Sequence, residues 1–139
     1  MKNYFVLGAS SVIGRAIALQ LSGQGHTVYG TYHKNGQVDG LNLKYHELNV
    51  LSEQSNFDFL PENLDGFVYC PGNIKLKPFE RISPEEFTDD FTLQVIHAAK
   101  SLQKVLPRLK KSTQASVIFF SSIAVGKGFN YHSLVSTSK

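Results

Sequence analysis

Short runs of apolar residues alternate along the chain with segments of helical periodicity, and this alternation constrains the possible folds more than any other feature. The apolar runs are of strand length and lie at 4–7, 28–32, 45–48, 66–70 and 115–121. Strands that alternate with helices form βαβ units, and such units build parallel sheets. The second, fourth and fifth runs show little polar alternation, as expected when helices cover both faces of a sheet. The sequence therefore predicts a doubly wound parallel α/β sheet with strand order 3-2-1-4-5 and right-handed crossovers.

Three segments predict helices. Apolar residues recur every four positions over 13–21, which predicts a helix that ends at the glycines of 23–25. The Ser-Pro-Glu-Glu segment at 83–86 supplies an N-cap hydroxyl, a proline at the first helical position and a glutamate at the third. An apolar stripe over 87–109 follows and is long enough to cover one face of the sheet. A short helix closed by a proline is also expected over 52–59.

Composition excludes several classes of protein. The chain has 139 residues, 42% of them hydrophobic and 18% charged, which predicts one folded domain over 1–139 with one core. The net charge of +3 is small and scattered, so no nucleic-acid partner is expected. No apolar run approaches the ~18 residues that span a bilayer, and no signal-peptide pattern precedes the first predicted strand. The lone Cys70 cannot form an internal disulfide, which fits a reducing compartment. Together these features predict a cytoplasmic protein with no membrane segment.

The segment 7–14, Leu-Gly-Ala-Ser-Ser-Val-Ile-Gly, joins the first predicted strand to the first predicted helix. Gly8 allows the chain to turn sharply at the strand end, and Gly14 lets the helix pack closely on the strand. Ser10 and Ser11 offer hydroxyl and backbone N–H groups at a helix N-terminus, where a phosphate binds favourably. The turn therefore predicts a binding site for the pyrophosphate of a dinucleotide. The alternative is a β–α turn without a ligand.

This turn resembles that of the short-chain dehydrogenase/reductase family, which usually reads Thr-Gly-x-x-x-Gly-Ile-Gly. Leu7 replaces the threonine of that pattern, and Val12 replaces the middle glycine. Four further landmarks follow in the family's order and spacing: Asn-Val at 49–50 for its Asp-Val pair, Val-Tyr-Cys-Pro-Gly at 68–72 for its Asn-Asn-Ala-Gly run, Ser-Ser at 121–122 for its serine pair, and Ser-Thr-Ser-Lys at 136–139 for the end of its Tyr-x-x-x-Lys motif.

The resemblance implies a Rossmann-like domain that binds a nicotinamide dinucleotide and acts on the carbonyl or alcohol group of a small molecule. It also implies that the chain is a fragment, covering about the N-terminal half of a domain with a six- or seven-stranded sheet. The full-length protein is expected to be a homo-oligomer. The residues that the resemblance assigns to the cofactor are Gly8, Ser10, Ser11, Ile13, Asn49, Val50, Cys70, Gly72 and Lys139.

The residues after the second predicted strand bear on which dinucleotide is bound. Proteins of this fold that bind NAD usually carry an acid about 20 residues past the turn, where it holds the ribose diol. Here Tyr32 stands at that place, followed by His33 and Lys34. No acidic residue occurs before Asp39, and positive charge favours the 2′-phosphate of NADP(H). NADP(H) is therefore predicted over NAD(H), with Thr31, His33 and Lys34 as candidate ligands of the 2′-phosphate; the alternative is a solvated loop with an incidental lysine.

The family's catalytic residues are a serine, a tyrosine, a lysine four residues after the tyrosine, and an asparagine on the long helix. The resemblance assigns the serine to Ser122, the lysine to Lys139 and the place of the asparagine to Gln94. Val135 occupies the place of the tyrosine, and its side chain cannot donate a proton. Because the family's spacing between Ser122 and this place is kept, the tyrosine is absent rather than displaced.

His132 is the candidate to replace the missing proton donor. In an ideal helix, at ~100° per residue, His132 lies roughly 20° from Lys139 around the axis and Tyr131 roughly 80°. Histidine is suited to proton transfer near neutral pH. Some relatives within the family carry a histidine at this offset and no tyrosine. The alternative is that His132 lies in a loop or at the start of a helix and has no catalytic role.

Two functions from different classes remain. One is an NADP(H)-dependent oxidoreductase with an atypical active site, which Ser122, His132 and Lys139 favour. The other is a catalytically silent dinucleotide-binding module for sensing or assembly, which Val135 favours. No metal is expected, because no metal-ligand spacing is seen among the remaining histidines, His26, His33, His46 and His97.

Overall fold

The computed structural model describes all 139 residues and contains one five-stranded sheet. Its strands are β1 (Asn3–Leu7), β2 (Thr27–Tyr32), β3 (Leu43–Glu47), β4 (Gly66–Tyr69) and β5 (Ser116–Phe119). All neighbouring strands are parallel, in the order β3-β2-β1-β4-β5. The doubly wound, Rossmann-like sheet predicted from the sequence is therefore confirmed.

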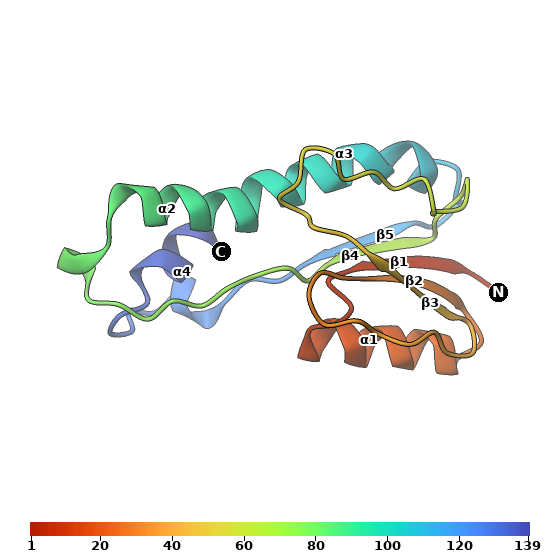
Figure 1. Cartoon of the computed structure of the whole chain (residues 1–139), viewed down its shortest axis with the longest axis horizontal. Coiled ribbons are helices and arrows are strands. Elements are labelled where there is room, and N and C mark those ends of the chain that lie inside the picture. The colour runs from red at the N-terminus through yellow and green to blue at the C-terminus, as the bar shows by residue number, and fades with distance from the viewer.

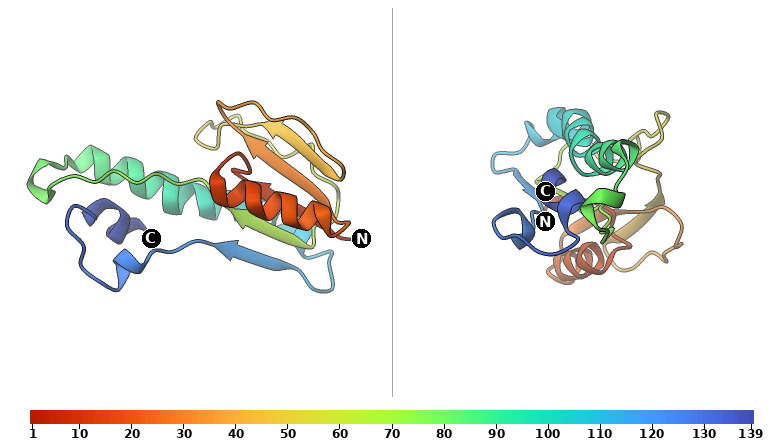
Figure 2. Two further views of the ribbon diagram at one scale, coloured as in Figure 1. Left: turned by 90° about the horizontal axis from the view of Figure 1, so that it is seen from below. Right: turned by 90° about the vertical axis from the view of Figure 1, so that its left-hand side faces the viewer.

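Helices cover both faces of the sheet (Figure 1). They are α1 (Val12–Gly23), α2 (Pro84–Phe91), α3 (His97–Leu109) and α4 (Ser133–Ser138), with a π-helical turn η2 (Thr92–Ile96) and two 3-10 turns, η1 (Phe79–Arg81) and η3 (Ile123–Val125). α1 lies on one face, and α3 lies on the other as the continuation of α2 and η2. This long helix extends past the end of the sheet, where α4 packs against α2 (Figures 1 and 2). No helix combines the length and apolar character needed to cross a membrane.

The hydrophobic core has two layers, one on each face of the sheet. Successive side chains of a strand point to opposite faces. Phe5 and Leu7 therefore join the layer that contains Val105 and Leu109 of α3, whereas Val6 joins the layer that contains residues of α1. Burial of these side chains fixes the register of the sheet, because a shift of one residue would turn them toward the wrong face.

The start of the long helix follows its sequence signal. The Ser83 hydroxyl accepts a hydrogen bond from Glu86 N–H, and the Glu86 carboxylate accepts one from Ser83 N–H, which forms the predicted capping box. Pro84 occupies the first helical position. Lys77 adds an ion pair with Glu86 at 2.6 Å. These contacts define the helix end that overhangs the sheet.

The short helix predicted over 52–59 is not formed, and this segment contains turns and irregular backbone. Its carbonyl groups are bound by side chains of α3 instead. Lys104 Nζ donates to Ser55 O at 2.6 Å. Arg108 Nη2 donates to Phe57 O at 3.3 Å, and the Phe57 ring is buried in the layer under α3. Tertiary burial therefore overrides a weak local preference for helix.

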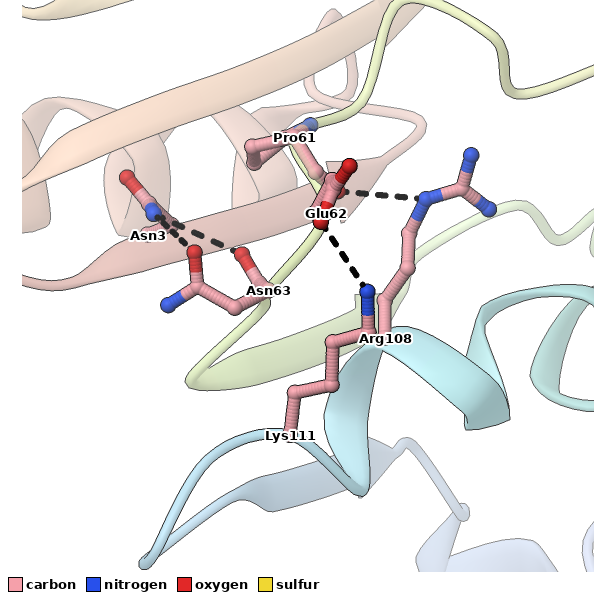
Figure 3. A network of polar contacts seen from close by, with 6 residues as sticks. All are labelled: Asn3, Pro61, Glu62, Asn63, Arg108 and Lys111. Atoms are coloured by element: carbon pink, nitrogen blue, oxygen red, sulfur yellow. Dashed lines mark hydrogen bonds and ion pairs between the residues drawn. The ribbon is translucent and has the colours of Figure 1, made fainter.

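The connection that leads into β4 is held between α3 and β1 (Figure 3). Arg108 Nε donates to Pro61 O at 3.1 Å. Asn3 Nδ2 donates to the backbone and side-chain oxygens of Asn63, at 3.4 and 3.3 Å. Beside these bonds, Lys111 in the turn after α3 forms an exposed ion pair with Glu62 at 3.2 Å.

β5 forms one edge of the sheet, and all of its residues are exposed. The exposed fractions of Val117, Ile118 and Phe119 are 40%, 45% and 48%. An unpaired strand edge that carries apolar side chains is a surface on which another strand can pair.

Candidate functional site

Two adjoining cavities lie at the carboxyl ends of the strands, where open α/β sheets bind ligands. The first has a volume of about 420 Å³, and the predicted cofactor residues that line it are Gly8, Ser10, Ser11, Thr31, His33, Asn49, Val50, Cys70 and Gly72. The second has a volume of about 360 Å³, and the predicted site residues that line it are Ser11, Ile13, Cys70, Gly72, Ser122 and Lys139. Because Ser11, Cys70 and Gly72 border both, the cavities form one elongated site.

The turn between β1 and α1 is packed too tightly for side chains at its two glycines. Gly8 has a φ of 79°, a left-handed conformation that glycine adopts without strain. A Cβ atom on Gly8 would lie 3.0 Å from the backbone nitrogen of Pro71, which follows β4. A Cβ atom on Gly14 would collide with the carbonyl oxygen of Gly8. Both glycines are therefore required by the turn itself, which brings its backbone close to the end of β4.

The N-cap of α1 borders both cavities, and the first turn of the helix borders the second. Ser11 is the N-cap, and its hydroxyl accepts a hydrogen bond from Gly14 N–H at 3.1 Å. The N–H groups of Val12 and Ile13 belong to the first turn, where an α-helix offers no acceptor of its own. Both residues line the second cavity. These donors and the positive end of the helix dipole can therefore serve an anion in the site.

The residues predicted to bind a 2′-phosphate differ in their placement. Thr31 is buried, and its hydroxyl accepts a hydrogen bond from Gly8 N–H at 2.9 Å, so it braces the turn. His33 lines the first cavity, whereas Lys34 is exposed and does not line it. Glu47, the register partner of the last residue of β2, shares with His33 a further hollow of about 400 Å³. The sequence prediction missed this acid, because only the strand register brings it beside β2.

Ser122 and Lys139 meet in the second cavity. Ser122 is the N-cap of η3, and its Oγ accepts a hydrogen bond from Ala124 N–H at 3.2 Å. The neighbouring Ser121 Oγ donates to the backbone oxygen of Lys139 at 3.2 Å. This bond ties the segment after β5 to the end of α4, and it holds the two predicted site residues at the same end of the sheet.

The side chains of Lys139 and Gln94 both lie close to Gly72. A Cβ atom on Gly72 would lie 3.2 Å from Gln94 Oε1 and 3.5 Å from Lys139 Nζ. Gln94 Nε2 donates to Asn73 O at 3.0 Å, whereas Gln94 Oε1 is buried without a hydrogen-bond partner in the protein. Gln94 belongs to η2, and π-helical turns occur often at functional sites. An unpaired buried acceptor beside an ammonium group is a place for a bridging water or a ligand hydroxyl.

Opposing influences act on the Lys139 side chain. Burial lowers the pKa of Lys139, while the Asp90 carboxylate and Cys70 raise it. Burial raises the pKa of the Cys70 thiol to about 11, against the effect of Lys139. The thiol is therefore neutral near pH 7, and Asp90 supplies the negative charge that acts on Lys139.

Asp90, which the sequence analysis did not single out, acts on Lys139 from outside the two cavities. It lies in the last turn of α2, one helical turn before Gln94, and is 8% exposed. Ser138, which is 7% exposed, donates from its Oγ to Asp90 Oδ2. The sequence does hold one signal for Asp90. It lies four residues before the predicted site residue Gln94, and residues four apart on a helix face the same neighbour.

The structure does not bring His132 into the second cavity. Val135 lines that cavity and is buried. His132 is the N-cap of α4, with a φ of −97° and a ψ of 14°, so the ideal-helix angle to Lys139 does not apply to it. Its Nδ1–H donates to Asn130 O at 2.7 Å, and its ring lies beside that of Phe129. The role of His132 as a proton donor stays a prediction.

Comparison with known proteins identifies a family. The model of the family described as short chain dehydrogenase matches residues 2–139. A 3-ketodihydrosphingosine reductase of Bacteroides thetaiotaomicron is 30% identical in an alignment 146 residues long that covers 96% of this chain and 52% of the relative. The chain therefore spans about half the length of that curated relative.

Solved structures of the same fold extend beyond this chain as well. A short-chain dehydrogenase from Streptomyces avermitilis superposes with a TM-score of 0.84 at 26% identity, over 100% of this chain and 57% of that one. A ligand-free aldohexose dehydrogenase from Thermoplasma acidophilum superposes with a TM-score of 0.85 at 21% identity, over 99% of this chain and 55% of that one.

Proposed function

Because the chain belongs to the short-chain dehydrogenase family, we propose that the protein is an NADP(H)-dependent oxidoreductase that interconverts a carbonyl and an alcohol on a small molecule. The observation that carries this proposal is the elongated site, which runs from the glycine turn to Ser122 and Lys139. Its position along the carboxyl ends of the strands suits a dinucleotide whose pyrophosphate lies at the N-terminus of α1.

The groups around the site fit such a cofactor. First-turn N–H groups at Ile13 and the hydroxyl of Ser10 would bind the pyrophosphate. Asn49 and Val50, which line the first cavity, would hold the adenine end. Lys139, in the second cavity, would hold the ribose of the nicotinamide end. When bound, the nicotinamide supplies or accepts a hydride.

The proposed preference for NADP(H) rests on the charges near the end of β2. His33 lines the first cavity, and Lys34 follows it in an exposed position where a phosphate group can reach it. Glu47 opposes the preference, since its carboxylate shares a hollow with His33. No acid stands at the end of β2 itself, where the ribose diol of NAD is usually held.

The protein's own groups would act on the reacting oxygen. Ser122 would donate a hydrogen bond to that oxygen, and the Lys139 ammonium group would stabilise negative charge that develops nearby. His132 would supply the proton during reduction. Because its Nδ1–H donates to the carbonyl oxygen of Asn130, Nε2 is the nitrogen that exchanges a proton. For this step the ring has to turn from the edge of α4 into the second cavity.

A catalytically silent dinucleotide-binding module is the second candidate. The observation that favours it is Val135, which forms part of the cavity wall where the family carries its tyrosine, while His132 lies outside. Such a module would use the same cofactor contacts without transferring a hydride.

One experiment on the full-length protein separates the two candidates. NADPH is mixed with a panel of ketones and aldehydes, and its consumption is followed by absorbance. Turnover that disappears in Lys139→Met supports the oxidoreductase. NADPH binding in a calorimetric titration, with no turnover on any carbonyl, supports the silent module. Absence of binding to both NADPH and NADH contradicts both candidates.

A further inference from the structure

A buried hydrogen bond joins α4 to the long helix. Ser138 Oγ donates to Asp90 Oδ2 and lies 3.1 Å from Leu134 O within its own helix. Both side chains of the bond are more than nine-tenths buried. α4 lies alongside α2 beyond the end of the sheet (Figures 1 and 2). The bond therefore fixes the end of α4 against α2, one residue before Lys139.

A carboxylate at this depth calls for an explanation beyond the bond itself. Burial of a charge costs several kcal/mol unless a partner compensates it, and a serine hydroxyl is a neutral partner. No lysine or arginine nitrogen lies within ion-pair distance of Asp90. Its hydrogen-bond partner Ser138 directly precedes Lys139 in the chain, so the bond holds the carboxylate near that lysine. The carboxylate raises the pKa of Lys139, against the larger effect of burial, which lowers it. The carboxylate thus opposes the loss of the lysine's proton at the site.

The other groups around the pair do not replace this charge. Facing Lys139 are the Cys70 thiol, which is neutral near pH 7, and the uncharged amide of Gln94. On its other side Asp90 borders a cavity of about 430 Å³, whose other titratable lining groups are Lys75, Asp89 and His97. Because those three side chains are exposed or half-exposed, water screens them from Lys139 more than it screens Asp90.

We propose that Asp90 is a positioning residue for Lys139: its carboxylate anchors Ser138 and supplies the counter-charge that keeps the lysine an ammonium ion over Gly72. The inference rests on the proposed function, in which that ammonium group holds the cofactor's ribose and stabilises charge at the reacting oxygen. A buried lysine without a counter-charge releases its proton more readily. Asp90 therefore raises the pH above which Lys139 loses its proton and can no longer hold the ribose or stabilise charge at the reacting oxygen.

Two isosteric or near-isosteric variants separate the charge from the bond. Asp90→Asn keeps an oxygen that accepts from Ser138 and removes the negative charge. Ser138→Ala removes the bond and keeps the charge. Asp89→Asn is the matched control, since it removes an exposed carboxylate from the neighbouring position of the same helix. The titration of Lys139 is followed by NMR in full-length protein labelled with ¹³C-lysine, and Lys139→Met identifies its signal.

We expect the Lys139 pKa to fall by about one pH unit in Asp90→Asn and to stay unchanged in Asp89→Asn. NADPH affinity should then begin to fall about one pH unit lower in Asp90→Asn than in the natural protein. In Ser138→Ala the lysine should titrate as in the natural protein. Equal titration of Lys139 in Asp90→Asn and Asp89→Asn would overturn the proposal and leave Asp90 a structural anchor only.

Should Asp90→Asn fail to fold, the double variant Asp90→Leu with Ser138→Ala removes the charge together with its hydrogen-bond partner. Its Lys139 pKa is compared with that of Ser138→Ala alone, and we expect it to be lower by about one pH unit. Equal Lys139 pKa values in the double variant and in Ser138→Ala would also refute the proposal. The NMR titration needs no cofactor or substrate, so it decides the role of Asp90 even if the protein binds no dinucleotide and the proposed function fails.

Discussion

The backbone N–H of Gly8 donates a 2.9 Å hydrogen bond to the hydroxyl of Thr31. This bond joins the turn after β1 to the end of β2, across the cavity wall that both residues form. Since Thr31 is 1% exposed, water cannot replace its hydroxyl if the side chain is changed. The shape of the turn therefore depends on a side chain from the neighbouring strand.

Thr31→Val tests whether the turn after β1 depends on the Thr31 hydroxyl. Valine keeps the shape of the side chain but leaves the Gly8 N–H unpaired, which costs about 1–3 kcal/mol. We expect a lower free energy of unfolding in urea titration and weaker NADPH binding in calorimetry. Thr27→Val, at the other end of β2, serves as the control because the Thr27 hydroxyl makes no hydrogen bond within the protein. Equal effects of the two variants would contradict the assigned role.

Gly8→Val should abolish dinucleotide binding while the sheet remains folded. The substitution forces a β-branched residue into a left-handed conformation and against Pro71. Circular dichroism reports the fold, and calorimetric titration with NADPH reports binding. Gly36→Ala is a suitable control, since nothing lies within 4 Å of a Cβ atom placed there. Retained binding in Gly8→Val would mean that the turn is only structural.

Full-length protein should bind NADPH more tightly than NADH. Removing one charge near the 2′-phosphate changes binding by about 1 kcal/mol, or fivefold. Lys34→Ala should therefore weaken NADPH binding about fivefold and leave NADH binding unchanged. Glu47→Gln should act in the opposite direction on NADPH. Calorimetric titrations with both cofactors measure this, and NADH binding as tight as NADPH binding would reject the preference.

His132→Ala should remove most of the turnover without loss of NADPH binding, if the protein is an enzyme. Removal of a general acid costs ~10²–10⁴ in rate. Tyr131→Phe, at the adjacent position, should leave kcat within about twofold because that side chain is exposed and is given no role in proton transfer. Unchanged kcat in His132→Ala would remove the histidine from the mechanism. Val135→Tyr offers the converse test, since it places the family's phenol in the wall of the second cavity. A gain in kcat is the expected result.

Residues 1–139 expressed by themselves should self-associate through β5. The strand edge is unpaired, and its apolar side chains are nearly half exposed. Ile118→Lys should shift the sedimentation profile toward the monomer, because a charged edge opposes pairing. A monodisperse monomer of the natural sequence that unfolds cooperatively would contradict this expectation.

Local signals in the sequence predicted most of the fold. The capping box at Ser83 and Glu86 and the glycine turn are formed by neighbouring residues, so their geometry can be inferred without the rest of the molecule. The strand order follows from the alternation of strands and helices and from the handedness of crossovers. The helix predicted over 52–59 is not formed, and local signals could not reveal this. Side chains of α3, about fifty residues further along the chain, bind the backbone of this segment.

The candidate site was predictable only in part. Ser122 and Lys139, to which the resemblance gives catalytic roles, line one cavity, while the roles themselves stay predictions. The resemblance could not show that Glu47 lies beside the end of β2, or that Asp90 pairs with Ser138, because both depend on register and packing between distant segments. It also could not show that His132 is the N-cap of α4 and lies outside the cavity in this structure.

The π-helical turn η2 gives one continuous helix two different rotational phases. Each residue of an α-helix turns the chain by about 100°, so the extra residue held in a π-turn rotates everything before it relative to everything after it. Val105 and Leu109 of α3 face the core, while Asp90 and Gln94 face α4 and Gly72. Loss of a single residue from η2 would leave the core stripe in phase and swing Asp90 away from Ser138. The geometry around Lys139 thus depends on the length of a five-residue segment as much as on its chemistry.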